Sequence, residues 1–457
     1  MGSIKWVSVK EMKKVSCLVA PMVGFMILQS VAPVVSVMMV GHLDELSLSG
    51  ASVATSFTNV TGFAFLFGMA CALDTLCGQA YGAEEYEKLG NYTYGAIICL
   101  ILASLPICVV WIFTDKLLIL IGQDPSISTV ARNFSICLIP RLLAYAFLQP
   151  FSRFLQTQSL ILPLLFTTSA TLFFQIPLTW IFLFKLDLKT NGAAFALSIS
   201  SWFNVFLLGF YVKFSSKCQT TRAGSSPRHL LRGIIQFLRL ALPSTAMVCL
   251  EWWSSEVLIL LSGLLPNPKL ETSVVSICFT IIYIHFYVTY GFGGAVSVRV
   301  SNELGAGNAK AAKMATASIL VLGMLEVICI SAALFSCRKI LGYAFSNQKE
   351  IVDRIADLSP LMCFLIIIDS FQAVFSGVIR GSGWQDIGAY INLGAYYLIG
   401  IPAGAVLTFV LHLKSKGLMI GFFAGAVVHA ALLALIILFT DWQKQASKVR
   451  DKMLQSH

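Results

Sequence analysis

The sequence predicts an all-α polytopic membrane protein with twelve transmembrane helices in two pseudo-symmetric six-helix lobes. Three observations predict it: a composition poor in charge, a succession of long apolar segments, and a tandem repeat. The chain has 457 residues, of which 57% are hydrophobic and only 12% are charged, whereas a soluble domain averages about 25% charged residues. Because water cannot solvate a surface so poor in charge, much of the chain must have lipid as its solvent.

The apolar segments set the number of spans. A spanning helix needs about 20 mostly apolar residues, and twelve segments reach that length. The first follows a lysine-rich start and exceeds the roughly 7–15 apolar residues of a signal peptide, so we expect it to remain as a span. The predicted spans are residues 16–40, 50–80, 91–113, 127–157, 160–184, 192–213, 234–262, 271–302, 312–335, 353–381, 387–412 and 417–440.

The positions of the basic residues predict the orientation. Most of the 32 Lys and Arg residues fall in the N-terminus, the even-numbered loops and the C-terminal tail, with a cluster around residues 213–239. By the positive-inside rule, both termini are cytoplasmic. We interpret the net charge of +10 as the result of this orientation signal, together with an attraction of the basic loops to anionic lipid. Nucleic acid is not expected as a partner, because no aromatic platform lies between the basic residues.

The chain contains a tandem repeat with a period near 222–225 residues. Pro21 matches Pro243 at an offset of 222, the stretch 79–83 matches 302–306 at 223, and Pro177 matches Pro402 at 225. Each repeat holds six spans, so both should cross the membrane in the same sense and be related by an axis along its normal, as in parallel-repeat transporters. We therefore predict an N-terminal lobe (1–213), a cytoplasmic linker (214–233), and a C-terminal lobe with its tail (234–457).

Charged side chains within spans are candidates for function, because each costs roughly 2.5–3.5 kcal/mol to insert. Glu251 and Asp369 are distinguished by depth, since each lies roughly eleven residues, or about 16 Å, from the outer end of its span. Their counterparts in the first repeat are Gln29 and Tyr145, which carry no carboxylate. The remaining candidates, each of which can also be a satisfied structural residue, are Asp74, Arg141, Glu256, Glu326, His285 and His429.

Two carboxyl groups in a low-dielectric lobe can exchange protons, because desolvation and mutual repulsion favour the protonated form. The alternative is that each makes a permanent hydrogen bond between helices. Tyr283, Tyr287 and Tyr290 form a helical stripe that fits either an aromatic cavity or ordinary packing. Proline removes a backbone hydrogen bond and permits bending, so the possible bends, or static kinks, are at Pro21, Pro33 and Pro243.

Four motifs stand out in the sequence: LDTLCGQAYGA at 73–83, LEWW at 250–253 with LSGLLPNP at 261–268, RVSNELGAGN at 299–308, and SGVIRGSGWQ at 376–385. They resemble those of the plant detoxification subfamily of the MATE (multidrug and toxic compound extrusion) proteins, and the resemblance covers essentially all twelve spans. It implies a proton-coupled antiporter for organic, often cationic, compounds, with no cofactor, in which the acidic residues of spans 7 and 10 carry the coupling. Those positions fall on Glu251 and Asp369. Further candidates for the cavity lining are Gln372, Asn392 and Tyr396.

The expected partners are small organic substrates, protons and the lipid bilayer, with the protein as a monomer in the plasma membrane or the vacuolar membrane. Two alternatives remain at this stage. A flippase or exporter of lipid-linked or polysaccharide substrates would share the fold but should have a more basic cavity. A membrane-embedded enzyme or receptor belongs to another class, and the sequence shows no nucleophile–base pair or metal-ligand cluster that would indicate an enzyme.

Overall fold

The computed structural model describes residues 9–222, 227–265, 267–345 and 348–455. Among these residues are twelve helical segments long and apolar enough to cross a membrane, and this described part holds helices without any strand. The predicted fold class is confirmed. Residues 223–226 of the predicted linker and Pro266 of the second motif lie outside the described residues.

Contacts between residues divide the chain into two compact units. The N-terminal unit is Gly24–Thr245, and the C-terminal unit is Met1–Val23 together with Ala246–His457. The two divisions lie at equivalent positions of the repeat, two residues after Pro21 in α1 (Val9–Val40) and two residues after Pro243 in α10 (Pro227–Ser262). Each of these two helices therefore contributes one half to each unit.

The N-terminal unit is built from long helices whose starts are set by local sequence. Asp44 caps the first helix after α1, where its carboxylate accepts a hydrogen bond from the amide of Ser47 at 2.6 Å. Asp124 caps α7 in the same way, with Pro125 as its first residue. The elements are α2 (Glu45–Thr58), η1 (Asn59–Phe63), α3 (Ala64–Ala70), α4 (Ala72–Gly82), α5 (Tyr86–Ile112), α6 (Thr114–Leu120), α7 (Pro125–Thr157), α8 (Ile161–Trp180), η2 (Ile181–Lys185), α9 (Lys189–Phe214) and η3 (Ser216–Cys218).

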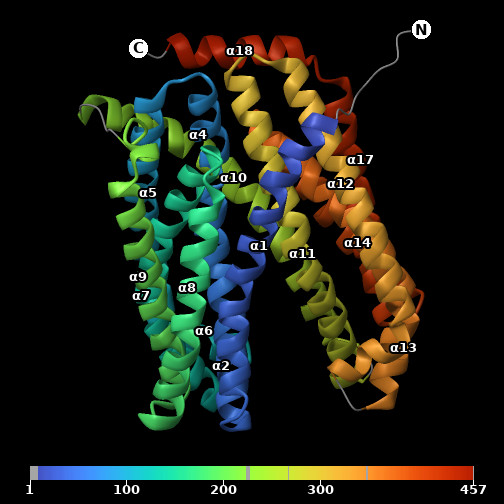
Figure 1. Cartoon of the computed structure of the whole chain (residues 1–457). Coiled ribbons are helices and arrows are strands. Elements are labelled where there is room, and N and C mark those ends of the chain that lie inside the picture. Colours follow the sequence, from blue (N-terminus) through green and yellow to red (C-terminus); the bar gives the residue numbers. More distant parts are fainter. Residues whose placement is uncertain (1–8, 223–226, 266, 346–347, 456–457) are drawn as a thin grey trace. The chain divides into compact units, whose positions relative to one another are not determined.

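The C-terminal unit is centred on α11 and α14, which pack together closely (Figure 1). Glycines permit this approach, because a Cβ at Gly377 would clash with the backbone oxygen of Gly293. The close packing holds the side chains of α14 directly against α11. The remaining elements of this unit follow from α10: α11 (Pro268–Gly305), α12 (Ala309–Ser336), α13 (Arg338–Leu341), η4 (Gly342–Ala344), α14 (Lys349–Ser382), α15 (Gln385–Asn392), η5 (Leu393–Gly400), α16 (Ile401–Ala405), η6 (Val406–Val410), α17 (Ser415–Phe439) and α18 (Trp442–Gln455).

The last helix, α18, is amphipathic and lies across the ends of α11 and α12 (Figure 1). Its apolar face buries Trp442, Ala446, Val449 and Met453. The hydrophobic effect therefore fixes this helix to the C-terminal unit, although its composition is far more polar than that of the spans.

Candidate functional site

The C-terminal unit contains a cavity lined by residues of α10, α11, α14, η5 and α17. Glu251 and Asp369 both line it, as do the predicted candidates Tyr283, Gln372 and Tyr396. Its volume is about 40 Å³, which holds a few water molecules, whereas pockets for drug-sized ligands occupy about 300–1,000 Å³. In this conformation the cavity is therefore small.

A directed chain of hydrogen bonds ends on Glu251. The hydroxyl of Tyr396 donates to Oε1 of Gln372 at 2.9 Å, and Nε2 of Gln372 donates to Oε1 of Glu251 at 2.9 Å. The chain joins η5, α14 and α10. The amide of Gln372 thus links the carboxyl group of one helix to the phenol of another, so a change of charge at Glu251 acts on three elements.

Asp369 has its own partner on α11. The hydroxyl of Thr289 lies 3.2 Å from Oδ2 of Asp369 and can donate a hydrogen bond to it. Both carboxyl groups thus accept hydrogen bonds from neutral side chains within one cavity. Such donors stabilise a carboxylate without neutralising its charge, which leaves that charge available to a proton or to a cationic ligand.

Asn392 and two of the three tyrosines of the stripe do not line the cavity. Asn392 is fully buried, and its side-chain amide donates to the backbone oxygen of Met247 at 2.6 Å, one turn before Glu251. Of the stripe, Tyr283 lines the cavity and hydrogen bonds to Ser255. Tyr287 is 39% exposed, and the ring of Tyr290 lies 5.1 Å from the guanidinium carbon of Arg380. Neither of these two tyrosines lines the cavity.

The other charged candidates also acquire partners. Glu326 on α12 pairs with His285 on α11, with 3.0 Å between Oε1 and Nε2. The guanidinium of Arg141 lies 5.0 Å from the centre of the Phe63 ring, in the geometry of a cation–π contact. Glu256, by contrast, does not line the cavity.

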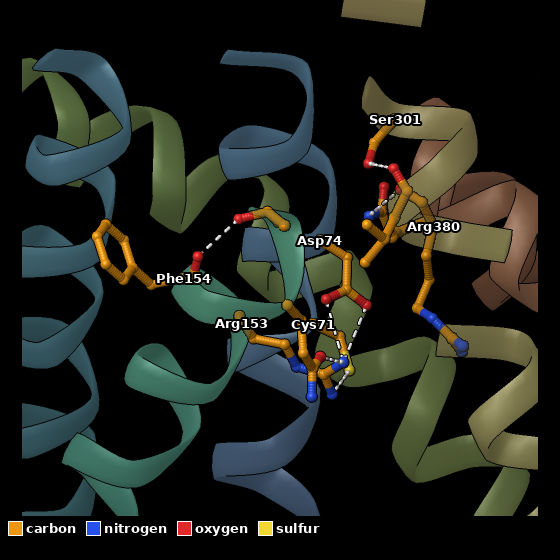
Figure 2. Close-up of polar contacts among 10 residues, drawn as sticks. Cys71, Asp74, Arg153, Phe154, Ser301 and Arg380 are labelled. Carbon is orange, nitrogen blue, oxygen red and sulfur yellow. Dashed lines mark hydrogen bonds and ion pairs between the residues drawn. The ribbon is translucent and has the colours of Figure 1, made fainter. Parts of the chain in front are cut away.

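Sequence reasoning missed two buried arginines, Arg153 and Arg380. In the N-terminal unit, Arg153 Nη1 lies 3.1 Å from Asp74 Oδ1, and both side chains are 2% exposed. Figure 2 shows the guanidinium of Arg153 and the carboxylate of Asp74 facing each other, beside Cys71. The sequence could have identified both arginines, because they lie inside the predicted spans 127–157 and 353–381. The free energy of inserting an arginine into the membrane is similar to that of inserting an acidic residue.

Two observations indicate no built metal site in the described part of the chain. Among the described residues, no three His, Cys, Asp or Glu side chains gather closely enough to hold a metal ion. All twelve cysteines are free thiols, and most of them are buried. The cavity lining presents two carboxyl groups, aromatic rings and an amide.

Comparisons with known proteins agree on one family. The MatE family model matches the chain twice, at residues 21–181 and 243–406, and the two matches start at the repeat-related prolines. The Arabidopsis thaliana proteins DETOXIFICATION 3 and DETOXIFICATION 6 are 52% and 49% identical, over 98% and 97% of this chain and 94% and 92% of theirs. The crystal structure of the eukaryotic MATE transporter AtDTX14 superposes with a TM-score of 0.93 and 47% identity, covering 97% of this chain and 99% of that one.

Proposed function

Because this chain belongs to the MATE family and resembles its plant detoxification transporters along nearly its whole length, we propose that it is a proton-coupled antiporter. It exports organic, cationic compounds, either xenobiotics or secondary metabolites, across a membrane. The observation that carries the proposal is the placement of Glu251 and Asp369 in one cavity of the C-terminal unit. Among the described residues, the lining has two carboxyl groups and aromatic rings but no basic side chain, which favours a cation over an anion.

The coupling follows from competition for the carboxylates. Protons from the acidic side neutralise Glu251 and Asp369, and a neutral cavity no longer attracts an organic cation. Loss of the protons to the cytoplasm restores the negative charges, and the cation binds. Coupling requires only that proton and substrate favour different conformational states.

The hydrogen bonds of Glu251 provide a route from protonation to shape. A hydrogen bond to an ionised carboxylate is roughly twice as strong as one to a neutral acceptor. Protonation of Glu251 therefore weakens the link from α10 to Gln372 on α14. Pro243 lies eight residues earlier in α10, and it removes one backbone hydrogen bond there. Weakening the link leaves α10 free to bend at that proline, with Pro21 and Pro33 as the possible bends of α1.

The proposed orientation has both termini in the cytoplasm, with the protein in the plasma membrane or the vacuolar membrane. The expected partners are small organic substrates, protons and lipid, with the protein as a monomer. The flippase alternative is less well supported, because the described residues that line the cavity include two acids and no basic residue that would hold a phosphate.

The test is uptake of fluorescent organic cations into proteoliposomes under an imposed pH gradient. We expect wild-type protein to accumulate the cation, and Glu251→Gln or Asp369→Asn to reduce accumulation to the level of protein-free vesicles. Glu256→Gln is the matched control, since it removes an intramembrane carboxylate outside the cavity. Normal gradient-driven uptake by both cavity variants would refute the assignment of these carboxylates.

A further inference from the structure

The part of the cavity wall that carries Tyr396 is not an ordinary α-helix. Leu393–Gly400 (η5) is a π-helix, and the amide that follows it, of Ile401, bonds to the carbonyl of Tyr396 five residues earlier. A further π-helix, η6 (Val406–Val410), lies just beyond α16. A π-turn holds about one residue more than an α-turn, and such turns are rare and frequent at functional sites. The segment is therefore a candidate for a part of the cavity that moves.

The tandem repeat provides an internal comparison for this segment. At the offset of 225 residues, η6 matches η2 (Ile181–Lys185), which is also a π-helix. By contrast, η5 matches residues 168–175, which lie within α8 and are α-helical. At the matching position, the unit without the cavity thus has an α-helix where the unit with the cavity has a π-helix.

Four glycines form the contact between this segment and α17, which we name the glycine crossing. They are two pairs at a spacing of four residues, Gly400 with Gly404 and Gly421 with Gly425. A Cβ at Gly421 would clash with the backbone of Gly404, and a Cβ at Gly425 would lie 3.2 Å from the Cα of Gly400. Small residues at this spacing let two membrane helices approach backbone to backbone. The matching residues of the first repeat are Gln175, Thr179, Ala196 and Ser200.

The glycine crossing lowers the barrier to a turn of the segment about its axis. Most helix pairs are held at one rotation because the side chains of each helix fit into grooves of the other. At the glycine crossing, neither helix places a side chain of these four residues in such a groove. A turn of the segment over α17 therefore exchanges one backbone contact for another, and η6 lies beyond α16 to take up the change.

Tyr396 brings η5 to the cavity. Its side chain is 2% exposed, its hydroxyl donates to Gln372 at 2.9 Å, and its ring stacks on Phe422 with 5.6 Å between the ring centres. Conversion of η5 from a π-helix to an α-helix would move Tyr396 by up to one residue position, or about 100° around the helix axis. A turn of this size breaks the hydrogen bond to Gln372 and takes the ring out of the cavity.

The cavity must widen before it can hold a substrate of the proposed class. Its volume is about 40 Å³, whereas pockets for drug-sized ligands occupy about 300–1,000 Å³. Tyr396 is one of the large side chains that fill it, and Gln372 links its hydroxyl to Glu251. Withdrawal of this ring would both enlarge the cavity and release one donor of the chain that ends on the carboxyl group.

We propose that η5 is a switch that sets the size of the cavity: as a π-helix it holds Tyr396 in the cavity, and as an α-helix, turned over the glycine crossing, it withdraws the ring and admits an organic cation. The inference rests on the proposed function, because it takes this cavity as the place where the substrate binds. It predicts that residues of the glycine crossing, which do not line the cavity, control access to it.

The test replaces Tyr396 by fluorotyrosine, which keeps the hydroxyl, and follows the ring by fluorine NMR of the full chain in detergent. Gln372→Leu removes the acceptor of the hydroxyl. Because one neutral hydrogen bond changes an equilibrium about two- to tenfold, we expect a second resonance, from the withdrawn ring, to gain population by that factor. Adding Gly404→Ala should suppress this resonance, because the extra methyl group obstructs the turn. It should still fold, since its Cβ makes only ordinary contacts in the present packing, the nearest at 3.5 Å from Gly421.

The matched control is Gly323→Ala on α12, where the added Cβ would lie 3.9 Å from the ring of Phe292, outside the glycine crossing. It should leave the second resonance of Gln372→Leu unchanged. A single resonance in Gln372→Leu, or a second resonance that persists when Gly404→Ala is added, would overturn the inference and leave η5 as a static part of the wall.

Uptake of tetraphenylphosphonium into proteoliposomes separates this inference from the proposed function. This cation should increase the second resonance in protein with Gln372 intact, and Gly404→Ala should slow its uptake about two- to tenfold, whereas Gly323→Ala should not. If wild-type protein accumulates the cation but the spectrum stays unchanged, or if Gly404→Ala transports at the wild-type rate, the switch is wrong and the function stands. If wild-type protein shows no gradient-driven uptake, the proposed function fails, and the spectra of Gln372→Leu still decide this inference.

Discussion

The buried ion pair of the N-terminal unit provides a sharp stability test. Arg153 on α7 and Asp74 on α4 are 3.1 Å apart, and both are almost completely buried. At this distance two unit charges attract by about 5 kcal/mol for an effective dielectric constant of about 20. Removing one partner abolishes this ion pair while the other charge stays buried, which typically costs about 3–5 kcal/mol.

The perturbation is a double-mutant cycle with Arg153→Met, Asp74→Leu and both together. Each single variant should lose about 3–5 kcal/mol of stability, and the melting temperature should fall by on the order of 10 °C. The double variant should lose less than either single one, because no unpaired charge remains. The assay is thermal unfolding in detergent, followed by intrinsic tryptophan fluorescence.

The matched control is Arg132→Met, on the same helix α7. Arg132 pairs with Asp115 at 3.6 Å, but its side chain is 38% exposed, and such pairs contribute about 0–1 kcal/mol. We therefore expect a small change. If Arg153→Met is no more destabilising than Arg132→Met, or if the two single effects add in the double variant, the pair does not act as a buried ion pair.

Three further outcomes follow from the structure. Gly377→Ala should lower the melting temperature, at a cost of about 1–3 kcal/mol for overpacking, whereas Gly394→Ala, with open space around it, should change little; equal effects would contradict the packing argument. The backbone and side-chain hydrogen bonds from Ser47 lower the pKa of Asp44, so the cap of α2 is intact at neutral pH and is lost only as pH falls through that lowered value. Amide exchange at the start of α2 should thus be faster in Asp44→Ala at neutral pH, with the difference vanishing in strong acid, and a difference that persists there would refute this reading. For the proposed orientation, a membrane-impermeant maleimide should label exposed Cys337 on intact cells, and a Cys337→Ser, Lys444→Cys protein only after permeabilisation; the reverse pattern would invert the topology.

The sequence alone determined the number of spans, the repeat and the depth of the candidate acids. These features can be read from the linear sequence, because they depend only on the length of the apolar segments and on the spacing of residues such as proline. The repeat-matched prolines Pro21 and Pro243 were found in this way, and the family model begins its two matches at the same residues. The depth argument also selected Glu251 and Asp369, which the structure brings into one cavity.

Only the tertiary structure decided which side chains meet. The partners of Asp74 and Glu326 are 79 and 41 residues away, and the stripe of three tyrosines contributes only Tyr283 to the cavity. The physical reason is that a helix can be rotated about its axis without changing its apolar pattern when lipid and protein neighbours are equally apolar. Close contacts such as that at Gly377 then set the rotation, and the rotation determines which residue faces a charge, a cavity or the lipid.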